Sequence, residues 1–337
     1  MSDWTPLAGV KVIDLSQQLP GPFGTLLLRT LGASVVKVEP PSGDHSLIVD
    51  PPLFERMNSD KEIVTIDLKS DAGREQLHEM VADADVFFEG MRPGVVKRLA
   101  ADWETLSAIN PGLVYCSLSG FGPTGPLVER AGHDLNFLAL AAGLPDGLPD
   151  SEGLIRVPWV DLASGTNCAL AVVAALMERA TTGKGRHLEI ALLDAATIWA
   201  SAKLPREGSE GAYGVFETAD RRRVVIAVLE DAMWTRMFAA LGWSDWAEDQ
   251  RMTDHGYRRM RGDEVRTRVT ESIAALTLAE VLELADQHDL AVTRVNDVDE
   301  AAVDPQIAAR DLFPDDEHWR PLGQIGQSVR RASRRES

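Results

Sequence analysis

The chain is poor in cysteine, with only Cys116 and Cys168 among 337 residues. Both stand inside apolar runs without the spacing of a metal site or a disulfide framework, so we expect buried thiols in a reducing compartment. The seven histidines include no H-x-x-x-H pair and have no cysteine partners nearby, so the common zinc patterns are missing. The sequence therefore predicts no bound metal.

Long apolar runs are also missing, since none approaches the roughly 18 residues that a membrane-spanning helix needs. The opening MSDWTPLAGV lacks the basic start and apolar stretch of a secretory signal. We therefore expect a cytoplasmic protein without a membrane partner.

Positive charge is scarce. The 34 Lys and Arg residues against 52 Asp and Glu give a net charge of −18. This balance argues against nucleic acid as a partner, because binding phosphates requires a basic face. The basic ending, residues 328–337, is expected to be a solvated tail.

Short runs rich in Val and Ile alternate with helical patterns over the first 200 residues. The strand-like runs are 10–16, 34–41, 61–69, 85–90, 112–119 and 186–194. The helical patterns are 22–32, 71–83, 94–109 and 162–185, the last ended by Gly183. This alternation predicts βαβ units and an α/β fold with a parallel sheet covered on both faces.

The composition changes after residue 200, where residues 201–214 form a connector rich in glycine and charge. Beyond it, we expect two strands and amphipathic helices, at 224–229, 232–242, 264–288 and 291–297. The sequence therefore predicts a large domain, residues 1–200 and 303–337, and a smaller α/β domain, residues 215–302.

The stretch GFGPTG, Gly120–Gly125, fits the dinucleotide pattern G-x-G-x-x-G. Pro123 removes a backbone donor, Pro126 obstructs a helix start, and the stretch does not follow the first strand. The nucleophile pattern G-x-S-x-G is absent. We therefore expect neither a nicotinamide or flavin site nor a serine hydrolase, although a glycine loop that admits a ligand to the backbone stays open.

Three titratable residues, His133, Asp161 and Glu230, stand at junctions between strands and helices, where α/β proteins bind their ligands. Each also has a structural explanation. Asp161 suits the N-cap of the long helix after it, and Glu230 suits a first helical turn. Asp134 suits the cap of its own helix, with His133 merely beside it. The residues alone leave both interpretations open.

A series of segments resembles one known family: PLAGVKVIDLS, PGPFGTLLLRTLGASVVKVEPPSGD, KEIVTIDLK, ADVFFEGMRPGVVKRL, NPGLVYCSLSGFGPTGP, TGKGRHLEIALLDAA and VFETADRRRVVIAVLED. On these segments the chain resembles the class III CoA-transferases (CaiB/BaiF type), and among them the α-methylacyl-CoA racemases. The resemblance implies a large Rossmann-like domain, a small domain, and a homodimer of two interlocked, ring-like chains.

The resemblance also implies the ligand, an acyl-CoA thioester held by the large domain near the domain interface. Coenzyme A is then part of the substrate, and no separate cofactor is expected. The residues that match the family's CoA-contacting segments are Asp67, Leu68, Arg92, Gly132, Asp134 and Asn136.

The first function that the resemblance implies is racemisation at the α-carbon of a 2-methyl or other 2-substituted acyl-CoA. Here His133 and Asp161 match the acid–base groups on opposite faces of that carbon, and Glu230 matches the glutamate that supports the histidine. The thioester carbonyl acidifies the α-hydrogen, so removing it gives a planar enolate that either group can reprotonate. A histidine pKa near 6.5 suits both roles.

Two other functions stay open. In a CoA-transferase, Asp161 would be the nucleophile, forming an acyl-aspartyl anhydride and then an aspartyl-CoA thioester. A catalytically weak acyl-CoA-binding homologue is the third, because Val157 stands where racemases often carry an asparagine. The sequence does not reveal which acyl group is bound.

Overall fold

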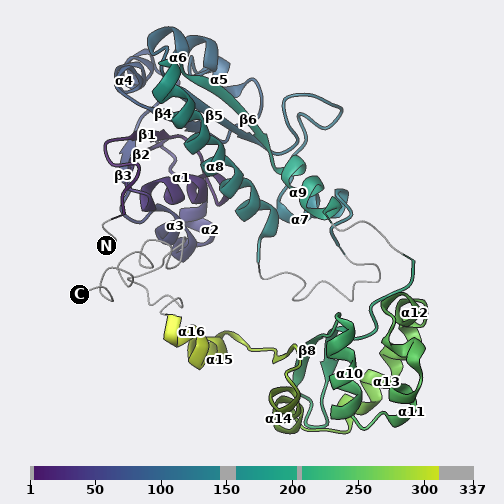
Figure 1. Cartoon of the computed structure of the whole chain (residues 1–337). Helices are drawn as coiled ribbons and strands as arrows, with labels where there is room; N and C mark the ends of the chain where they lie inside the picture. The colour runs from purple at the N-terminus through teal and green to yellow at the C-terminus, as the bar shows by residue number, and fades with distance from the viewer. Residues whose placement is uncertain (1–3, 145–156, 203–206, 311–337) are drawn as a thin grey trace. The chain divides into compact units, whose positions relative to one another are not determined.

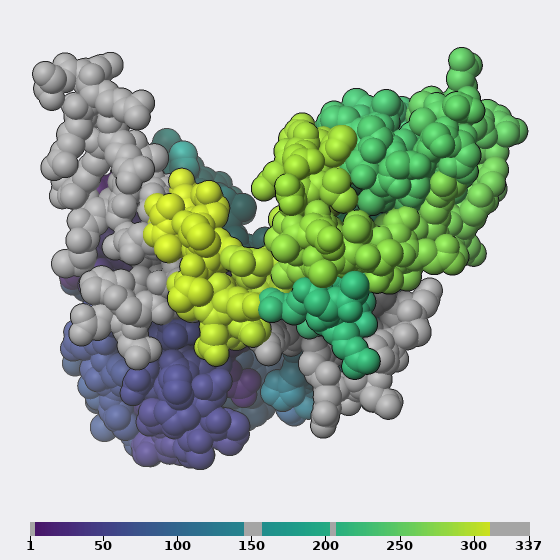
Figure 2. Space-filling model, turned by 90° about the horizontal axis from the view of Figure 1, so that it is seen from below, coloured from purple at the N-terminus to yellow at the C-terminus, as the bar shows by residue number. Residues whose placement is uncertain are grey.

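The structure, a computed structural model, describes residues 4–144, 157–202 and 207–310 (Figure 1); the other residues are grey in Figures 1 and 2. The chain divides between residues 203 and 204 into two compact units, each of which has its own core. Most of the stretch 303–337, which the sequence assigns to the large domain, lies outside the described residues, and its described part, residues 303–310, belongs to the second unit.

The first unit is built on a six-stranded parallel sheet with the strand order β3-β2-β1-β4-β5-β6. Its strands are β1 (Lys11–Asp14), β2 (Ser34–Glu39), β3 (Glu62–Thr65), β4 (Val86–Glu89), β5 (Val114–Ser119) and β6 (Arg186–Ala191). Each lies within a run that the sequence predicted as a strand. The predicted α/β fold with a parallel sheet is confirmed.

Helices cover both faces of this sheet (Figure 1). They are α1 (Pro20–Thr30), α2 (Ser46–Val49), α3 (Pro51–Asn58), α4 (Asp71–Ala82), α5 (Val95–Arg98), α6 (Trp103–Ile109), α7 (Asp134–Leu140), α8 (Trp159–Thr182) and α9 (Leu192–Ser201). Helices α1 and α8 share one core with the strands, and α4 and α6 share another on the opposite face. Alternate strand residues supply the two cores, as expected for a sheet buried on both sides.

Helix α8 is the longest helix among the described residues, and Gly183 ends it in the left-handed conformation, as the sequence predicts. By length and composition it would also suffice to cross a membrane, although 44% of that apolar stretch is buried. Core helices of soluble proteins pass the same test, and α8 packs on α1 and β5. It carries Cys168, which is buried and forms no disulfide, and the same holds for Cys116 of β5.

The second unit has a three-stranded antiparallel sheet, β7-β8-β9, packed against helices around a core that includes Trp234, Trp243 and Trp246. Its strands are β7 (Tyr213–Glu217), β8 (Arg223–Ala227) and β9 (Val292–Arg294). Its helices are α10 (Asp231–Ala240), α11 (Ser244–Glu248), the 3₁₀ helix η1 (Gln250–Thr253), α12 (His255–Met260), α13 (Gly262–Ala274), α14 (Leu278–His288), α15 (Val298–Ala302) and α16 (Pro305–Arg310).

Candidate functional site

His133 is the N-cap residue of α7, and its backbone is extended there. Its N–H donates to Oδ1 of Asn136, 3.0 Å away, so the asparagine side chain closes the start of the helix. The His133 side chain is exposed, and no side chain in the described ranges forms a hydrogen bond with its ring. The ring closes a capping box with the backbone of Asn136 and is otherwise exposed to solvent, from which a ligand can reach it.

Asp134 does not cap its own helix, so that expectation is wrong. Its Oδ1 instead accepts the backbone N–H groups of Val160, at 2.7 Å, and Asp161, at 3.0 Å. These are two of the N–H groups that the start of α8 leaves without helical partners. A carboxylate on α7 thus caps α8, and this cap joins the His133 segment to the Asp161 segment.

Asp161 lies in the first turn of α8, whose N-cap is Pro158, so the expectation that Asp161 precedes and caps this helix is also wrong. Its side chain is largely buried, and nothing in the described part of the chain donates a hydrogen bond to its carboxylate. Burial, and then the charge of Asp134, raise the pKa of Asp161 to about 7. The result is a carboxyl group that has no donor among the described residues and titrates near neutral pH, as many catalytic groups do.

Close packing of glycines brings the loop after β1 to the same place. A Cβ atom built on Gly165, one turn beyond Asp161, would stand 2.5 Å from the carbonyl oxygen of Pro20. A Cβ on Gly24 would stand 3.0 Å from the carbonyl oxygen of Gly165. Only glycine permits this contact between α1 and α8. The loop that ends at Pro20 therefore lies against the first two turns of α8.

Phe137 fixes α7 beneath the glycine loop that follows β5. Its ring meets that of Phe121 edge-on at 4.9 Å, and Cβ atoms on Gly120 and Gly132 would approach it to 3.0 and 2.9 Å. Turns and irregular backbone, not a helix, follow the GFGPTG stretch until α7. The backbone after the stretch therefore lacks the helix start that a dinucleotide motif requires, and Gly120 packs against the Phe137 ring.

The other expected CoA-binding residues occupy loops after strands of the first unit. Asp67 follows β3 and is exposed, and its Oδ1 accepts the N–H of Lys69 at 3.0 Å. Leu68 is 8% exposed and belongs to the core beside α4, so its side chain packs in the core. Arg92 follows β4 and is exposed. Parallel strands place these loops at one edge of the sheet.

Glu230 lies in the second unit, as the N-cap residue of α10. Its side chain is exposed and makes no capping hydrogen bond, and its place at the start of α10 still agrees with the structural explanation that its charge favours the helix dipole. The buried guanidinium of Arg258 donates to the Leu229 carbonyl, at 3.3 Å, and to Asp231, at 2.6 Å. Arg258 thus holds the turn on both sides of Glu230.

Sequence reasoning missed Glu89, the last residue of β4. Its carboxyl group is buried, and Oε2 accepts the N–H of Met91 at 2.7 Å. Burial raises the pKa of Glu89 to about 7, against hydrogen bonds from Met91 and Ser117 that lower it. The only signal in the sequence is an acidic residue directly after an apolar run.

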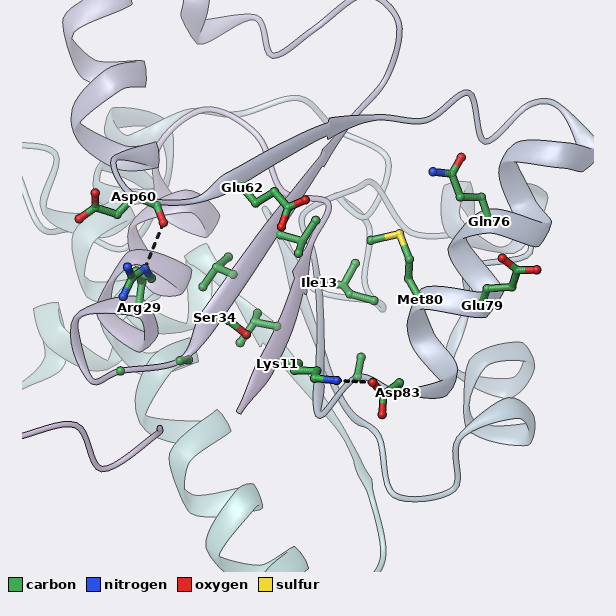
Figure 3. A pocket seen from close by; sticks show the side chains of 16 residues that line it. Lys11, Ile13, Arg29, Ser34, Asp60, Glu62, Gln76, Glu79, Met80 and Asp83 are labelled. Atoms are coloured by element: carbon green, nitrogen blue, oxygen red, sulfur yellow. Dashed lines mark hydrogen bonds and ion pairs between the residues drawn. The ribbon is translucent and has the colours of Figure 1, made fainter. Parts of the chain in front are cut away.

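A cavity of about 760 Å³ lies elsewhere in the first unit (Figure 3). Residues at the starts of β1 to β3, including Lys11, Ser34 and Glu62, line it, together with α4. Lys11 pairs with Asp83, and Arg29 donates to the carbonyl oxygen of Asp60. Ligands of α/β sheets bind at the opposite, carboxyl edge, and none of the candidate residues lines this cavity.

Within the described ranges, no group of three His, Cys, Asp or Glu side chains is placed to hold a metal ion. The candidate site is a set of protein groups around the first turn of α8. It offers a carboxyl group that titrates near pH 7, a second carboxylate beside it, and an exposed histidine. Such a set can supply a nucleophile or transfer a proton.

Comparisons with known proteins agree with this organisation. A family model described as CoA-transferase family III matches residues 7–333. The acetyl-CoA:oxalate CoA-transferase of Acetobacter aceti is 34% identical over 91% of this chain and 85% of that protein. The succinate–glutarate CoA-transferase of Agrobacterium fabrum is 30% identical over 92% of this chain and 85% of its own.

Solved structures give the same result. A crystal structure of Rv3272 from Mycobacterium tuberculosis is 30% identical, with a TM-score of 0.82 over 91% of this chain and 89% of that one. A CAIB/BAIF family protein from Brucella suis is 31% identical, with a TM-score of 0.76 over 97% and 99% of the two chains.

Proposed function

This chain belongs to the CoA-transferase family III, and we propose that it transfers CoA from an acyl-CoA thioester to a carboxylic acid, with Asp161 as the nucleophile. The observation that carries the proposal is the Asp161 carboxyl group, unpaired in the described structure, largely buried and with its pKa raised to about 7. Desolvation of this kind makes a carboxylate more reactive, because its charge is poorly stabilised in the resting enzyme.

The reaction balances in four steps. The Asp161 carboxylate attacks the thioester carbonyl and expels the CoA thiolate, leaving an acyl-aspartyl anhydride. The thiolate then attacks the aspartyl carbonyl, which releases the donor carboxylate and leaves an aspartyl-CoA thioester. The acceptor carboxylate attacks that thioester, forms a new anhydride and again frees the thiolate. Attack of the thiolate on the acyl carbonyl yields the new acyl-CoA and restores Asp161.

The relatives' names indicate the substrates to try first. Acetyl-CoA and oxalate, and succinate and glutarate, occur in the names of two relatives. We therefore propose a short acyl-CoA as donor and a small dicarboxylate as acceptor. Chromatography of the acyl-CoA products from such a panel tests the proposal, and a panel without any new thioester would count against it.

Racemisation of a 2-substituted acyl-CoA, the function that the sequence favours first, remains the second candidate. The observation in its favour is His133, which is exposed and adjacent to Asp134, whose carboxylate holds the backbone of Asp161. Racemisation requires exchange of the α-hydrogen with deuterated water, and the His133→Ala variant would lose that exchange. Transfer of CoA without exchange would eliminate this candidate.

The pH profile of transfer depends on the charge of Asp134. The nucleophile must be ionised, so kcat/KM is expected to rise with pH up to about the pKa of Asp161. In the Asp134→Asn variant the amide oxygen still caps α8, but the repulsion that raises the Asp161 pKa is removed. The rising limb should move to lower pH because the repulsion is gone. The pKa of Asp161 should still stay above its ordinary value, since burial, the larger cause of the raised pKa, remains. An unchanged limb in the kcat/KM profile would contradict this account.

We also propose that the chain forms a homodimer. Leu170 and Met177 on α8, and Ile198 and Trp199 on α9, are each more than half exposed, although all four are apolar. Helices α8 and α9 pack together, so these residues lie on neighbouring elements. Exposed apolar residues on adjoining helices commonly mark an interface. Sedimentation at the mass of one chain, 36.7 kDa, would contradict the proposal.

A further inference from the structure

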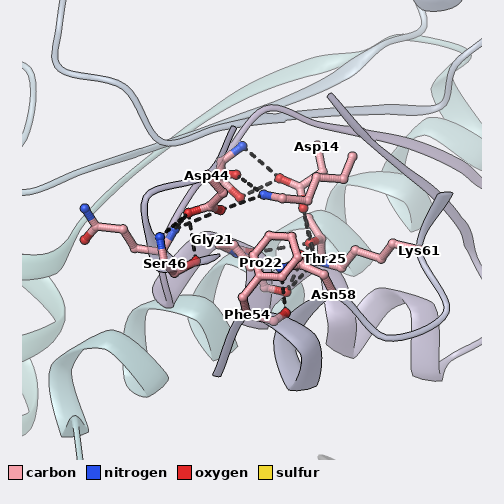
Figure 4. A network of polar contacts seen from close by, with 12 residues as sticks. Asp14, Gly21, Pro22, Thr25, Asp44, Ser46, Phe54, Asn58 and Lys61 are labelled. Carbon is pink, nitrogen blue, oxygen red and sulfur yellow. Dashed lines mark hydrogen bonds and ion pairs between the residues drawn. The ribbon is translucent and has the colours of Figure 1, made fainter. Parts of the chain in front are cut away.

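A network of buried charges lies beneath the loop that follows β1 (Figure 4). Lys37 pairs with Asp44 at 3.0 Å and Lys61 with Asp14 at 3.2 Å, and all four side chains are fully buried. Lys37 lies in β2, where a continuous apolar strand would be expected. Burying four charges is costly, so the network calls for an explanation beyond general stability.

The network binds the backbone of the loop directly. The Lys37 ammonium donates to the carbonyl oxygen of Ser16 at 2.7 Å. The N–H of Ser16 donates to Oδ1 of Asp14 at 2.9 Å. The N–H of Gln18 donates to both carboxylate oxygens of Asp44, at 3.2 and 3.3 Å. Buried side chains thus satisfy backbone groups that neither a strand nor a helix satisfies.

Gln18 adopts a left-handed conformation, with φ of 66°, and its side chain is exposed. Residues other than glycine rarely adopt this conformation, and surrounding contacts must hold it in place. The bonds from its N–H to Asp44 are such contacts. Asp44 is itself anchored by Ser46, whose N–H and hydroxyl donate to Oδ1 at 2.9 and 2.8 Å.

The loop occupies the place where this type of sheet binds ligands. The strand order reverses between β1 and β4, and ligands bind in the crevice at such a point. A Cβ atom built on Gly90, directly after β4, would stand 3.4 Å from Cβ of Ser16, so the two loops adjoin. Pro20, at the end of the loop, lies against α8 near Asp161, as described above.

We propose that Asp44 is a positioning residue, which holds the Ser16–Leu19 loop in its ligand-binding conformation before the acyl-CoA arrives. This inference rests on the proposed function, because it takes the acyl-CoA as the ligand. Preorganisation of this kind raises affinity, since the loop need not be ordered during binding. Asp44 acts through the backbone of Gln18 and takes no part in the chemistry.

A matched pair of variants separates positioning from general stability. Asp44→Asn retains an oxygen that can accept the N–H groups of Gln18 and Ser46, whereas Asp44→Ala retains none. Both remove the charge that neutralises Lys37, so both are expected to lower Tm. Arg179→Met serves as a control, because it also breaks a partly buried ion pair, the 2.7 Å pair with Asp85. Asp85 lies before the amino-terminal end of β4, whereas the Ser16–Leu19 loop lies at the carboxyl ends of the strands.

The measurement is the Kd for acetyl-CoA by titration calorimetry, together with KM, kcat and Tm. Asp44→Ala is expected to weaken binding about tenfold and raise KM by the same factor, with kcat nearly unchanged. Asp44→Asn and Arg179→Met are expected to bind within about threefold of wild type.

The positioning role would be overturned if Asp44→Ala bound acetyl-CoA as tightly as wild type does. It would also be overturned if Asp44→Ala and Asp44→Asn weakened acetyl-CoA binding by the same factor. Wild-type binding is measured first, so that the two claims can fail separately. A wild type that binds no acyl-CoA would count against the proposed function. Normal wild-type binding with an unaffected Asp44→Ala would count against the role of Asp44 alone.

Discussion

Asp161→Asn is expected to abolish CoA transfer and, at pH 8, to stabilise the protein. The amide cannot form the anhydride, so kcat should fall by at least about 10³-fold. The folded-state pKa, about 7, lies above the ordinary value of 3.8, so ionised Asp161 destabilises the fold. That cost is absent below about pH 4, grows as the pH rises, and is complete above about pH 7.

The amide removes a cost on the order of 2 kcal/mol at pH 8, which corresponds to a few degrees in Tm. Thermal unfolding of wild type and variant at pH 8 and pH 4 tests this, because the difference should nearly vanish at the lower pH. Gains in stability from removing a strained catalytic group are common in enzymes. A variant that is less stable than wild type at pH 8 would show that Asp161 is a structural residue.

Lys61→Met is expected to destabilise the first unit by about 3–5 kcal/mol, the usual effect of leaving a buried charge without its partner. The Lys61 ammonium donates to Asp14, to the hydroxyl of Thr25 and to the Asn58 side chain, at 3.2, 2.8 and 3.1 Å (Figure 4). Burial alone would raise the pKa of Asp14, but Lys61 and Lys37 lower it. Urea unfolding gives the change in free energy.

A second variant identifies the cause of this loss. In Asp14→Asn/Lys61→Met the charge of Asp14 is removed too, while its amide oxygen can still accept from Ser16 in the place of Oδ1. We expect the double variant to be at least about 1 kcal/mol more stable than the sum of the two single changes predicts. The destabilisation by Lys61→Met alone should also shrink as the pH falls and Asp14 becomes protonated. Strict additivity would mean that the two charges do not interact.

The parallel sheet could be predicted because its strands are buried on both faces and read as apolar runs between helical patterns. The antiparallel second unit was less evident. Strand β7 begins at Tyr213, inside the stretch interpreted as a connector, because Gly214 and the charges before it resemble a loop. The helical pattern 264–288 proved to be α13 and α14, separated where Thr277 caps the second helix with Glu280.

The candidate site was harder to predict, because its side chains form hydrogen bonds with segments that are distant in the sequence. Asp134 reads as a local cap, yet its carboxylate binds N–H groups 26 and 27 residues away. Asp161 reads as an N-cap, but the helix begins before it, at Trp159. Lys37 offers a local anomaly, a charge within an apolar strand, which indicates a buried partner without identifying it. Spacing along the chain carries no information about such long-range pairs.

Trapping the covalent intermediate tests the role of Asp161 most directly. The protein is incubated with acetyl-CoA and hydroxylamine, digested, and examined by peptide mass spectrometry. We predict a hydroxamate on Asp161 that depends on the thioester and is absent from the Asp161→Asn variant. An Asp161 peptide that stays unmodified while the enzyme turns over would contradict the account.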